Sequence, residues 1–201
     1  LNALEAALAL REQHGGTVTA ITMGPVAACE VLRECLCRGA DRTILLTDRR
    51  AAASDTLATS YILSQAIRKI GRYDFVFCGR QAIDGDTAQV GPQLAEKLGV
   101  TQITYVEAME GIEDGKITAR RNLGNGWQLV RAPLPVLLTV TGDAPAPRVA
   151  AARRMMKSKN ARTLAELEQS VRAANPTVDD ATVKSLAKEQ ADALAKQGLL
   201  I

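Results

Sequence analysis

Aromatic residues and histidine are scarce in this sequence. Phe, Trp and Tyr together make up 3% of its 201 residues, and His14 is the single histidine. So few aromatic side chains offer little material for stacking bases, and the net charge of +3 is only a mild excess of positive charge. A nucleic acid is therefore not an expected partner. His14 lies in a polar turn between a helix and a strand, so we expect it to be solvated.

The cysteines exclude the usual metal and disulfide arrangements. Cys29, Cys35, Cys37 and Cys78 contain no CxxC pair, and one histidine cannot complete a common zinc set. We expect reduced thiols, as in a cytoplasmic protein, with Cys35 and Cys37 as small residues on a helix. No residue resembles an acid, base or nucleophile of the usual kind. The sequence therefore predicts neither a catalytic residue nor a metal ligand.

Long apolar runs are absent too. No stretch reaches the length of a membrane span, and the first residues lack the basic and apolar regions of a signal peptide. These absences predict a soluble cytoplasmic protein without direct membrane insertion. The chain begins without Met inside an amphipathic helical pattern, and it stops on the apolar residues Leu199 to Ile201. We expect both ends to be cut from a longer protein.

Strand and helix patterns alternate through the first half of the chain. The expected strands are Thr17 to Thr22, Thr43 to Thr47 and Tyr73 to Cys78. The expected helices run from Leu1 to the Gly15-Gly16 stop, from Val26 to Arg38, from Asp55 or Thr56 to Ile70, and as far as Leu98. Parallel neighbours need crossover connections, so this alternation predicts an α/β fold with a mostly parallel, Rossmann-like sheet flanked by helices.

The second half of the chain predicts an antiparallel extension of that sheet. Short turns join four further expected strands, which are Thr101 to Val106, Lys116 to Asn122, Trp127 to Ala132 and Val136 to Val140. A Pro- and Arg-rich connection follows Asp143. Two more helices are expected to begin at Thr163 and at Val178.

The segment Gly79 to Pro92 carries the strongest signal for a binding site. It follows a buried strand and opens a helix, which is where open α/β sheets bind ligands. Gly79, Gly85 and Gly91 allow the backbone to come close to a ligand, and the free N–H groups of a helix start suit a phosphate. A plain turn has the same spacing, so the spacing alone leaves both interpretations open.

The side chains of this segment suggest how the contacts are divided. Asp84 and Asp86 would repel a phosphate, so we assign them to backbone N–H groups or to ribose hydroxyls. Thr87 and Gln89 would give neutral hydrogen bonds to the phosphates. Pro92 has no N–H to donate, and we expect the helix to restart or kink there.

The same segment resembles the nucleotide-binding segment of electron-transfer flavoprotein β subunits nearly residue by residue. Further matches to that family lie at Leu4 to Glu12, Met23 to Pro25, Gly39 to Asp41 and Pro133 to Thr139. The resemblance covers Leu1 to about Lys159. It implies an electron carrier that works through a bound flavin beside an α subunit. It also implies that a first strand and a C-terminal tail of the family are missing here.

The resemblance implies an adenine nucleotide. In the family the β subunit holds either AMP, as a structural ligand, or a second FAD in the nitrogen-fixation and electron-bifurcating types. Gly85 stands where AMP-holding members tend to carry another acid, and Ser54 to Ser60 resembles a segment of the FAD-holding types. FAD is therefore the implied cofactor, and AMP is the alternative. The implied cofactor site comprises Met23, Thr56, Thr59, Ser60, Gly79, Arg80, Gln81, Ala82, Ile83, Asp84, Gly85, Asp86, Thr87, Ala88, Gln89 and Val90.

Within that site the hydroxyls of Thr56, Thr59 and Ser60 would face the edge of the isoalloxazine. Arg80 would act as a fixed cation that favours the anionic reduced flavin. Each of these roles has a plain alternative. Ser, Asp and Thr at residues 54–60 also make an ordinary helix start, and Arg80 is equally a solvated loop residue.

The implied partners are the α subunit and a partner dehydrogenase and/or a quinone oxidoreductase. Residues 147–157 resemble the loop by which such proteins hook onto dehydrogenases, but Ala152 stands where the family has an anchoring leucine. Met155 and Met156 would supply the apolar contact instead, and a solvated basic connector is the alternative. We therefore divide the chain into a nucleotide-binding domain over residues 1–145 and a docking connector with C-terminal helices over residues 146–201.

Two other classes of protein share such a scaffold. One is a stand-alone adenine-nucleotide-binding module that resembles universal stress proteins. The other is an ATP-hydrolysing synthetase domain, whose phosphate loop would follow a first strand that this chain lacks. The Asp-Gly-Asp-Thr-Ala-Gln loop after a later strand favours the flavoprotein interpretation over both.

Overall fold

The computed structural model describes residues 1–158, 179, 181–182, 184–185 and 187–189. The chain divides into two compact units. The first comprises Leu1–Gly16 and Arg50–Arg148, and the second comprises Thr17–Arg49 and Val149–Ile201. The predicted helices from Thr163 and Val178 begin outside the described residues. The functional boundary after residue 145 stays a prediction.

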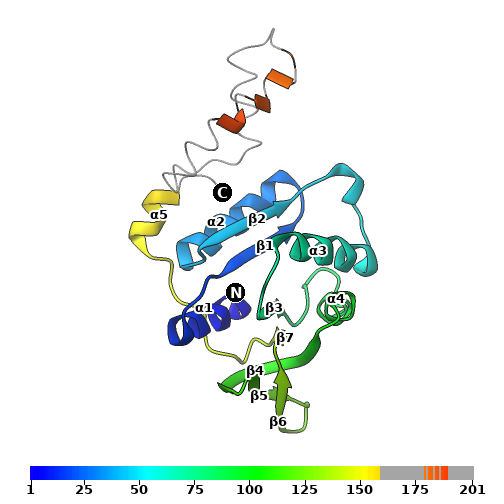
Figure 1. Ribbon diagram of the computed structural model, residues 1–201, viewed down its shortest axis with the longest axis vertical. Coiled ribbons are helices and arrows are strands. Elements are labelled where there is room, and N and C mark those ends of the chain that lie inside the picture. The colour runs from blue at the N-terminus through cyan, green and yellow to red at the C-terminus, as the bar shows by residue number, and fades with distance from the viewer. Residues whose placement is uncertain (159–178, 180, 183, 186, 190–201) are drawn as a thin grey trace. The chain divides into compact units, whose positions relative to one another are not determined.

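The first unit is built on a five-stranded sheet with the strand order β3-β7-β4-β5-β6 (Figure 1). The strands are β3 (Phe75–Gly79), β4 (Thr101–Glu113), β5 (Lys116–Asn122), β6 (Trp127–Pro133) and β7 (Val136–Val140). Strand β7 pairs in parallel with both β3 and β4, whereas β4, β5 and β6 pair in antiparallel order. The predicted α/β class, with a parallel part and an antiparallel extension, is confirmed.

Strand β7 lies in the middle of the parallel part. All five of its residues are buried, as expected for a strand that has neighbours on both sides and covered faces. Ile103, Ile117 and Leu138 are at most 2% exposed and belong to one apolar cluster of the sheet. This cluster joins the antiparallel strands to the parallel ones, so the extension shares the core of the first unit.

Three helices belong to the first unit, α1 (Asn2–His14), α3 (Thr56–Ile70) and α4 (Val90–Leu98). The Asp55 carboxylate caps α3, because Oδ1 accepts a hydrogen bond of 2.7 Å from the backbone N–H of Ala58. Leu8 of α1 and Leu94 of α4 are buried. His14 at the end of α1 is exposed, as predicted.

The structure corrects two details of the sequence-based expectations. Pro92 does not kink α4, because the helix begins only at Val90 and Pro92 falls in the first turn, where an N–H has no intrahelical acceptor. Strand β4 was expected to end at Val106 but continues to Glu113. Its second half pairs with β5, and these backbone hydrogen bonds hold a strand that lacks a regular apolar alternation.

Among its described residues, the second unit has two parallel strands, β1 (Thr19–Met23) and β2 (Arg42–Leu46). A 3-10 turn, η1 (Val26–Ala28), leads into α2 (Cys29–Arg38), and α5 (Ala152–Ser158) follows later in the chain. A second 3-10 turn, η2 (Arg49–Ala51), lies where the chain passes from this unit to the first. The thiols of α2, Cys29, Cys35 and Cys37, are buried, in agreement with the predicted role of Cys35 and Cys37 as small residues on a helix.

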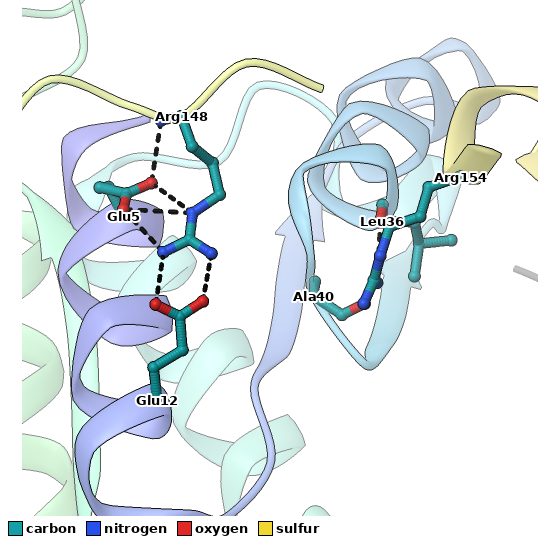
Figure 2. A network of polar contacts seen from close by, with 6 residues as sticks. All are labelled: Glu5, Glu12, Leu36, Ala40, Arg148 and Arg154. Carbon is teal, nitrogen blue, oxygen red and sulfur yellow. Dashed lines mark hydrogen bonds and ion pairs between the residues drawn. The ribbon is translucent and has the colours of Figure 1, made fainter. Parts of the chain in front are cut away.

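The connection after residue 143 is anchored by arginine side chains (Figure 2). In the first unit, Arg148 donates to both oxygens of Glu5, at 2.8 and 2.9 Å, and to the carboxylate of Glu12. In the second unit, Arg154 of α5 donates to the carbonyl oxygens of Leu36 and Ala40, both at 3.5 Å. The alternative of a solvated basic connector therefore does not describe Arg148, which is half-buried, but it stays open for Arg154, which is exposed.

Candidate functional site

The candidate site lies at the carboxyl end of β3, in the first unit. Strand β3 ends at Gly79, and the backbone N–H of Arg80 still donates to the carbonyl of Val140 at 3.0 Å. The chain then leaves the sheet as a loop over residues 80–89 and enters α4. Carboxyl ends of parallel strands are the usual ligand edge of an α/β sheet.

The loop is exposed and folded on itself. Residues 82–87 are all exposed, and Ile83 is 100% exposed. The N–H of Asp86 donates to the carbonyl of Ala82 at 3.0 Å, and the Gln81 amide donates to the Asp86 carboxylate. Asp86 and Ala88 have positive φ values of 49° and 54°. Such left-handed residues cost energy and gather at ligand sites, so they support the hypothesis that the loop is a binding segment.

The two loop carboxylates are placed differently from one another. The Asp86 carboxylate accepts a hydrogen bond from the Gln81 side chain. We had expected its partners to be backbone N–H groups or ribose hydroxyls. Asp84 is exposed. Its proposed contact with a ribose hydroxyl stays a prediction. Arg80 is also exposed, and its Nε donates to the Gln81 side chain at 3.0 Å.

The start of α4 is open to a ligand. Gln89 occupies the N-cap position, and its side chain makes no capping hydrogen bond to the helix. Uncapped N–H groups at a helix start attract an anion. Gly91 allows this start to lie close on the sheet, since a Cβ at that position would be only 2.7 Å from Cγ2 of Thr139. The third glycine of the segment therefore serves packing against β7.

The structure brings the start of α3 beside the start of α4. The Thr56 hydroxyl donates to Oε1 of Gln89 at 2.9 Å, and the Gln93 amide donates to the Thr56 hydroxyl at 3.3 Å. The Ser60 hydroxyl contacts Gln93 at 3.3 Å and the Leu57 carbonyl at 2.9 Å. Two segments that were singled out separately in the sequence thus meet through four polar side chains.

This placement changes what the three predicted hydroxyls can do. Ser60 is fully buried and its hydroxyl is occupied within the protein. The Thr56 hydroxyl is hydrogen-bonded to the side chains of Gln89 and Gln93. Thr59 is half-buried, and its hydroxyl has no partner in the described part of the chain. Met23 ends β1 in the second unit, and its contribution to a nucleotide stays a prediction.

Sequence reasoning missed Gln93 and Thr139. Gln93 follows Gln89 by one helical turn, so the two amides share a helix face, and this spacing is a signal that could have identified it. Thr139 reads as one residue of a buried strand. Its contact with Gly91 and its hydrogen bond from the Tyr105 N–H, at 3.0 Å, arise only in the folded sheet.

Two buried thiols of the chain are unsuited to chemistry. Burial raises the pKa of Cys78, the residue before Gly79, to about 11. Burial also raises the pKa of Cys35 in α2. Such thiols stay protonated near neutral pH and are poor nucleophiles and poor metal ligands. Within the described residues, no group of His, Cys, Asp and Glu side chains could hold a metal ion.

Across the residues that the structure describes, no helix combines the length and apolar character that crossing a bilayer requires.

Comparison with known proteins agrees with this architecture. Residues 1–169 match the electron transfer flavoprotein domain. The chain is 50% identical over 159 residues to the electron transfer flavoprotein subunit beta of Thermoanaerobacterium thermosaccharolyticum, covering 79% of this chain and 60% of that protein. It is 53% identical over 146 residues to Protein FixA of Azorhizobium caulinodans, covering 70% and 52%. It is 44% identical over 189 residues to the subunit beta of Megasphaera elsdenii, covering 90% and 68%.

The parallel strands, with a loop and a helix start at their carboxyl edge, define the class of Rossmann-like α/β proteins, in which ligands usually bind at this edge. Within that class, the chain belongs to the electron transfer flavoprotein family. It spans between about half and two thirds of the length of these relatives.

Proposed function

We propose that this chain is the greater part of a β subunit of a heterodimeric electron transfer flavoprotein, and that it holds FAD at the loop of residues 80–89. The observation that supports the proposal most is the exposed loop between the end of β3 and the uncapped start of α4. Relatives named as subunit beta imply an α subunit as the partner.

The described residues fit a nucleotide at this loop. The first N–H groups of α4 and the Thr87 hydroxyl would hold phosphates, together with the Gln89 amide. Gln89 accepts from Thr56 through its oxygen, so its NH₂ group can still donate. Asp84 would accept from a ribose hydroxyl. These contacts would direct neutral donors toward the phosphates and the Asp84 carboxylate toward the sugar.

Gly85 supports FAD over AMP. A Cβ at residue 85 would meet no heavy atom within 4 Å, so glycine is not required there for packing. Room and the absence of charge at this position instead suit the longer diphosphate of FAD. Thr59 is the best-placed of the three predicted hydroxyls for the flavin edge, because Thr56 and Ser60 are occupied by glutamine side chains and the backbone.

The bound flavin would supply the electron transfer, and the chain would supply binding and electrostatics. Arg80 lies at the first position of the loop and its guanidinium is exposed. A cation there would favour a negatively charged reduced flavin. A partner dehydrogenase and a quinone oxidoreductase as donor and acceptor, and a cytoplasmic location, are parts of the same proposal.

The nucleotide content of the full-length protein tests the proposal. The β subunit would be purified together with its α subunit and denatured, and the released nucleotides would be quantified. We expect two FAD molecules per heterodimer. One FAD and one AMP would mean that this subunit holds a structural nucleotide. The absence of both nucleotides from the β subunit would overturn the proposed site.

Introducing a charge at Gly85 is expected to separate the two nucleotides. In Gly85→Asp, the added carboxylate would repel the second phosphate of FAD, so FAD should bind about tenfold more weakly while AMP changes less. Equilibrium dialysis of the apoprotein with each nucleotide measures both affinities.

Gly126→Asp is the matched control, because Gly126 also lies in open surroundings but outside the loop. It should leave both affinities unchanged. Equal losses for FAD and AMP in Gly85→Asp would show that the second phosphate does not pass this residue.

A further inference from the structure

A cavity of about 460 Å³ lies beside the candidate site, at the same end of the first unit's sheet. It is bounded by the ends of β3, β5 and β7 and by the irregular part of β4. Its lining residues are Arg80, Tyr105, Arg121, Asn122, Leu123, Gly124, Thr141 and Asp143. Arg80 alone among them belongs to the predicted nucleotide site.

Two guanidinium groups line this cavity. Within the described residues, neither Arg80 nor Arg121 has a carboxylate partner, since Arg80 contacts Gln81 and Arg121 contacts Thr104. Asp143 is the single acid of the lining. Three other arginines of the first unit differ, because Arg120, Arg131 and Arg148 each lie within 4.0 Å of a carboxylate. The cavity therefore carries an excess of positive charge.

Arg121 is held in place rather than free. Its Nε donates to the Thr104 carbonyl at 3.1 Å, and its Nη2 donates to the Thr104 hydroxyl at 2.8 Å. This fork orients the half-buried side chain and leaves the Nη1 group without a partner in the described residues. A guanidinium that is already ordered loses little conformational entropy when it binds an oxyanion.

Tyr105 lies at the cavity in a strained backbone conformation. Its φ is +58°, and the pairing of β4 with β7 shifts register between Ile103 and Val106, on either side of it. The hydroxyl of buried Thr139 accepts from the Tyr105 N–H and holds this bulge. A β-branched or aromatic residue rarely adopts a positive φ, and such strain, like a bulge, occurs most often beside functional sites. The bulge keeps the tyrosine at the cavity, 38% exposed.

We infer that this cavity is a second anion site, which binds a phosphate or carboxylate group between Arg121 and Arg80. The Tyr105 hydroxyl provides a neutral hydrogen bond at its edge, whereas the Asn122 amide already donates to the Glu107 carboxylate. Asp143 opposes the anion. The inference goes beyond the proposed function, since seven of the eight lining residues lie outside the predicted nucleotide site. Free anions and a phosphate of a nucleotide bound at the adjacent loop are the two sources of such a group.

Titration of the full 201-residue chain with inorganic phosphate, followed by NMR, tests the site. We expect saturable shifts of the Arg121 Nε–H signal and of the backbone amides of Gly124 and Thr141. Arg121→Gln should lower the affinity for phosphate at least about tenfold, because it removes a charged hydrogen-bond donor. Asp143→Asn should raise the affinity for phosphate a few-fold, because it removes the opposing charge. This opposite sign cannot come from a loss of folding.

Arg131→Gln is the matched control. It makes the same change of charge on strand β6, where Arg131 lies outside the cavity, and it should change the affinity by no more than about twofold. Absence of saturable shifts, or equal affinity of Arg121→Gln and the parent chain, would overturn the inference. The nucleotide count of the heterodimer is independent of this result.

The same variants identify the source of the anion. If Arg121→Gln lowers the affinity for AMP as much as the affinity for inorganic phosphate, the cavity holds a phosphate of the nucleotide. If the affinity for AMP is unchanged while phosphate no longer binds, the cavity takes a free anion. Both outcomes support an anion site at Arg121.

Discussion

Replacing Gly91 with alanine is expected to lower the free energy of unfolding by about 2 kcal/mol. The added Cβ would lie 2.7 Å from Cγ2 of Thr139, a side chain that is 2% exposed in a fully buried strand. Neither α4 nor β7 can move away without loss of stability, because α4 begins at this point and β7 has a strand on each side. The sign is informative, since alanine is otherwise the better helix former by about 1 kcal/mol. Urea denaturation of the chain measures the change.

Gly126→Ala serves as the control for that substitution. A Cβ at residue 126 would meet no heavy atom within 4 Å, so the free energy of unfolding should change by less than about 0.5 kcal/mol. An unchanged or increased stability of Gly91→Ala would show that α4 does not lie as close to β7 as the structure has it.

Replacing Arg148 with methionine is expected to lower the free energy of unfolding by about 2 kcal/mol near neutral pH. The side chain of Glu5 is 14% exposed, and the substitution removes the guanidinium that donates to both of its oxygens. The hydrogen bonds to Glu12 contribute less, because that side chain is 53% exposed and water screens it. Thermal and urea denaturation compare the variant with the parent chain.

The cost of Arg148→Met should depend on pH. The hydrogen bond from Arg148 lowers the pKa of Glu12 below its ordinary value of 4.5. A lowered pKa contributes stability that is present above the ordinary pKa and is lost as the pH falls through the lowered one. The difference between parent and variant should therefore narrow below about pH 4.5. Arg153→Met, at an exposed position of α5, is the control and should show a small and pH-independent change.

Local features of the fold could be predicted because they depend on near neighbours in the chain. Asp55 or Thr56 was expected to begin a helix, and the Asp55 carboxylate does accept from the N–H three residues later. The strands β5 and β7 have the bounds that their apolar patterns predicted. The kink expected at Pro92 was wrong, because a proline effect depends on its place in the helix, and one residue of uncertainty at the helix start decides that place.

In the candidate site, too, the local features could be predicted from the sequence and the contacts between distant residues could not. The loop after β3 was predicted from its glycines and its position after a strand, and both are local. The hydrogen bonds of Thr56 with Gln89 and Gln93 join residues that lie 33 and 37 positions apart, and they occupy a hydroxyl that had been assigned to the flavin. A hydroxyl can bind either the protein or a ligand, and the sequence does not say which.

By itself, therefore, the sequence determined the α/β class, the cap of α3, the antiparallel extension and the loop after β3, because periodicity and capping act over a few residues. Only the tertiary structure decided that Arg148 pairs with Glu5 across 143 positions and that Tyr105 is held in a bulge by Thr139. It also decided that Arg80 and Arg121 line one cavity. Such pairs form where strands and helices from distant parts of the chain are packed together, and no local pattern encodes which distant partner a charged or polar side chain will meet.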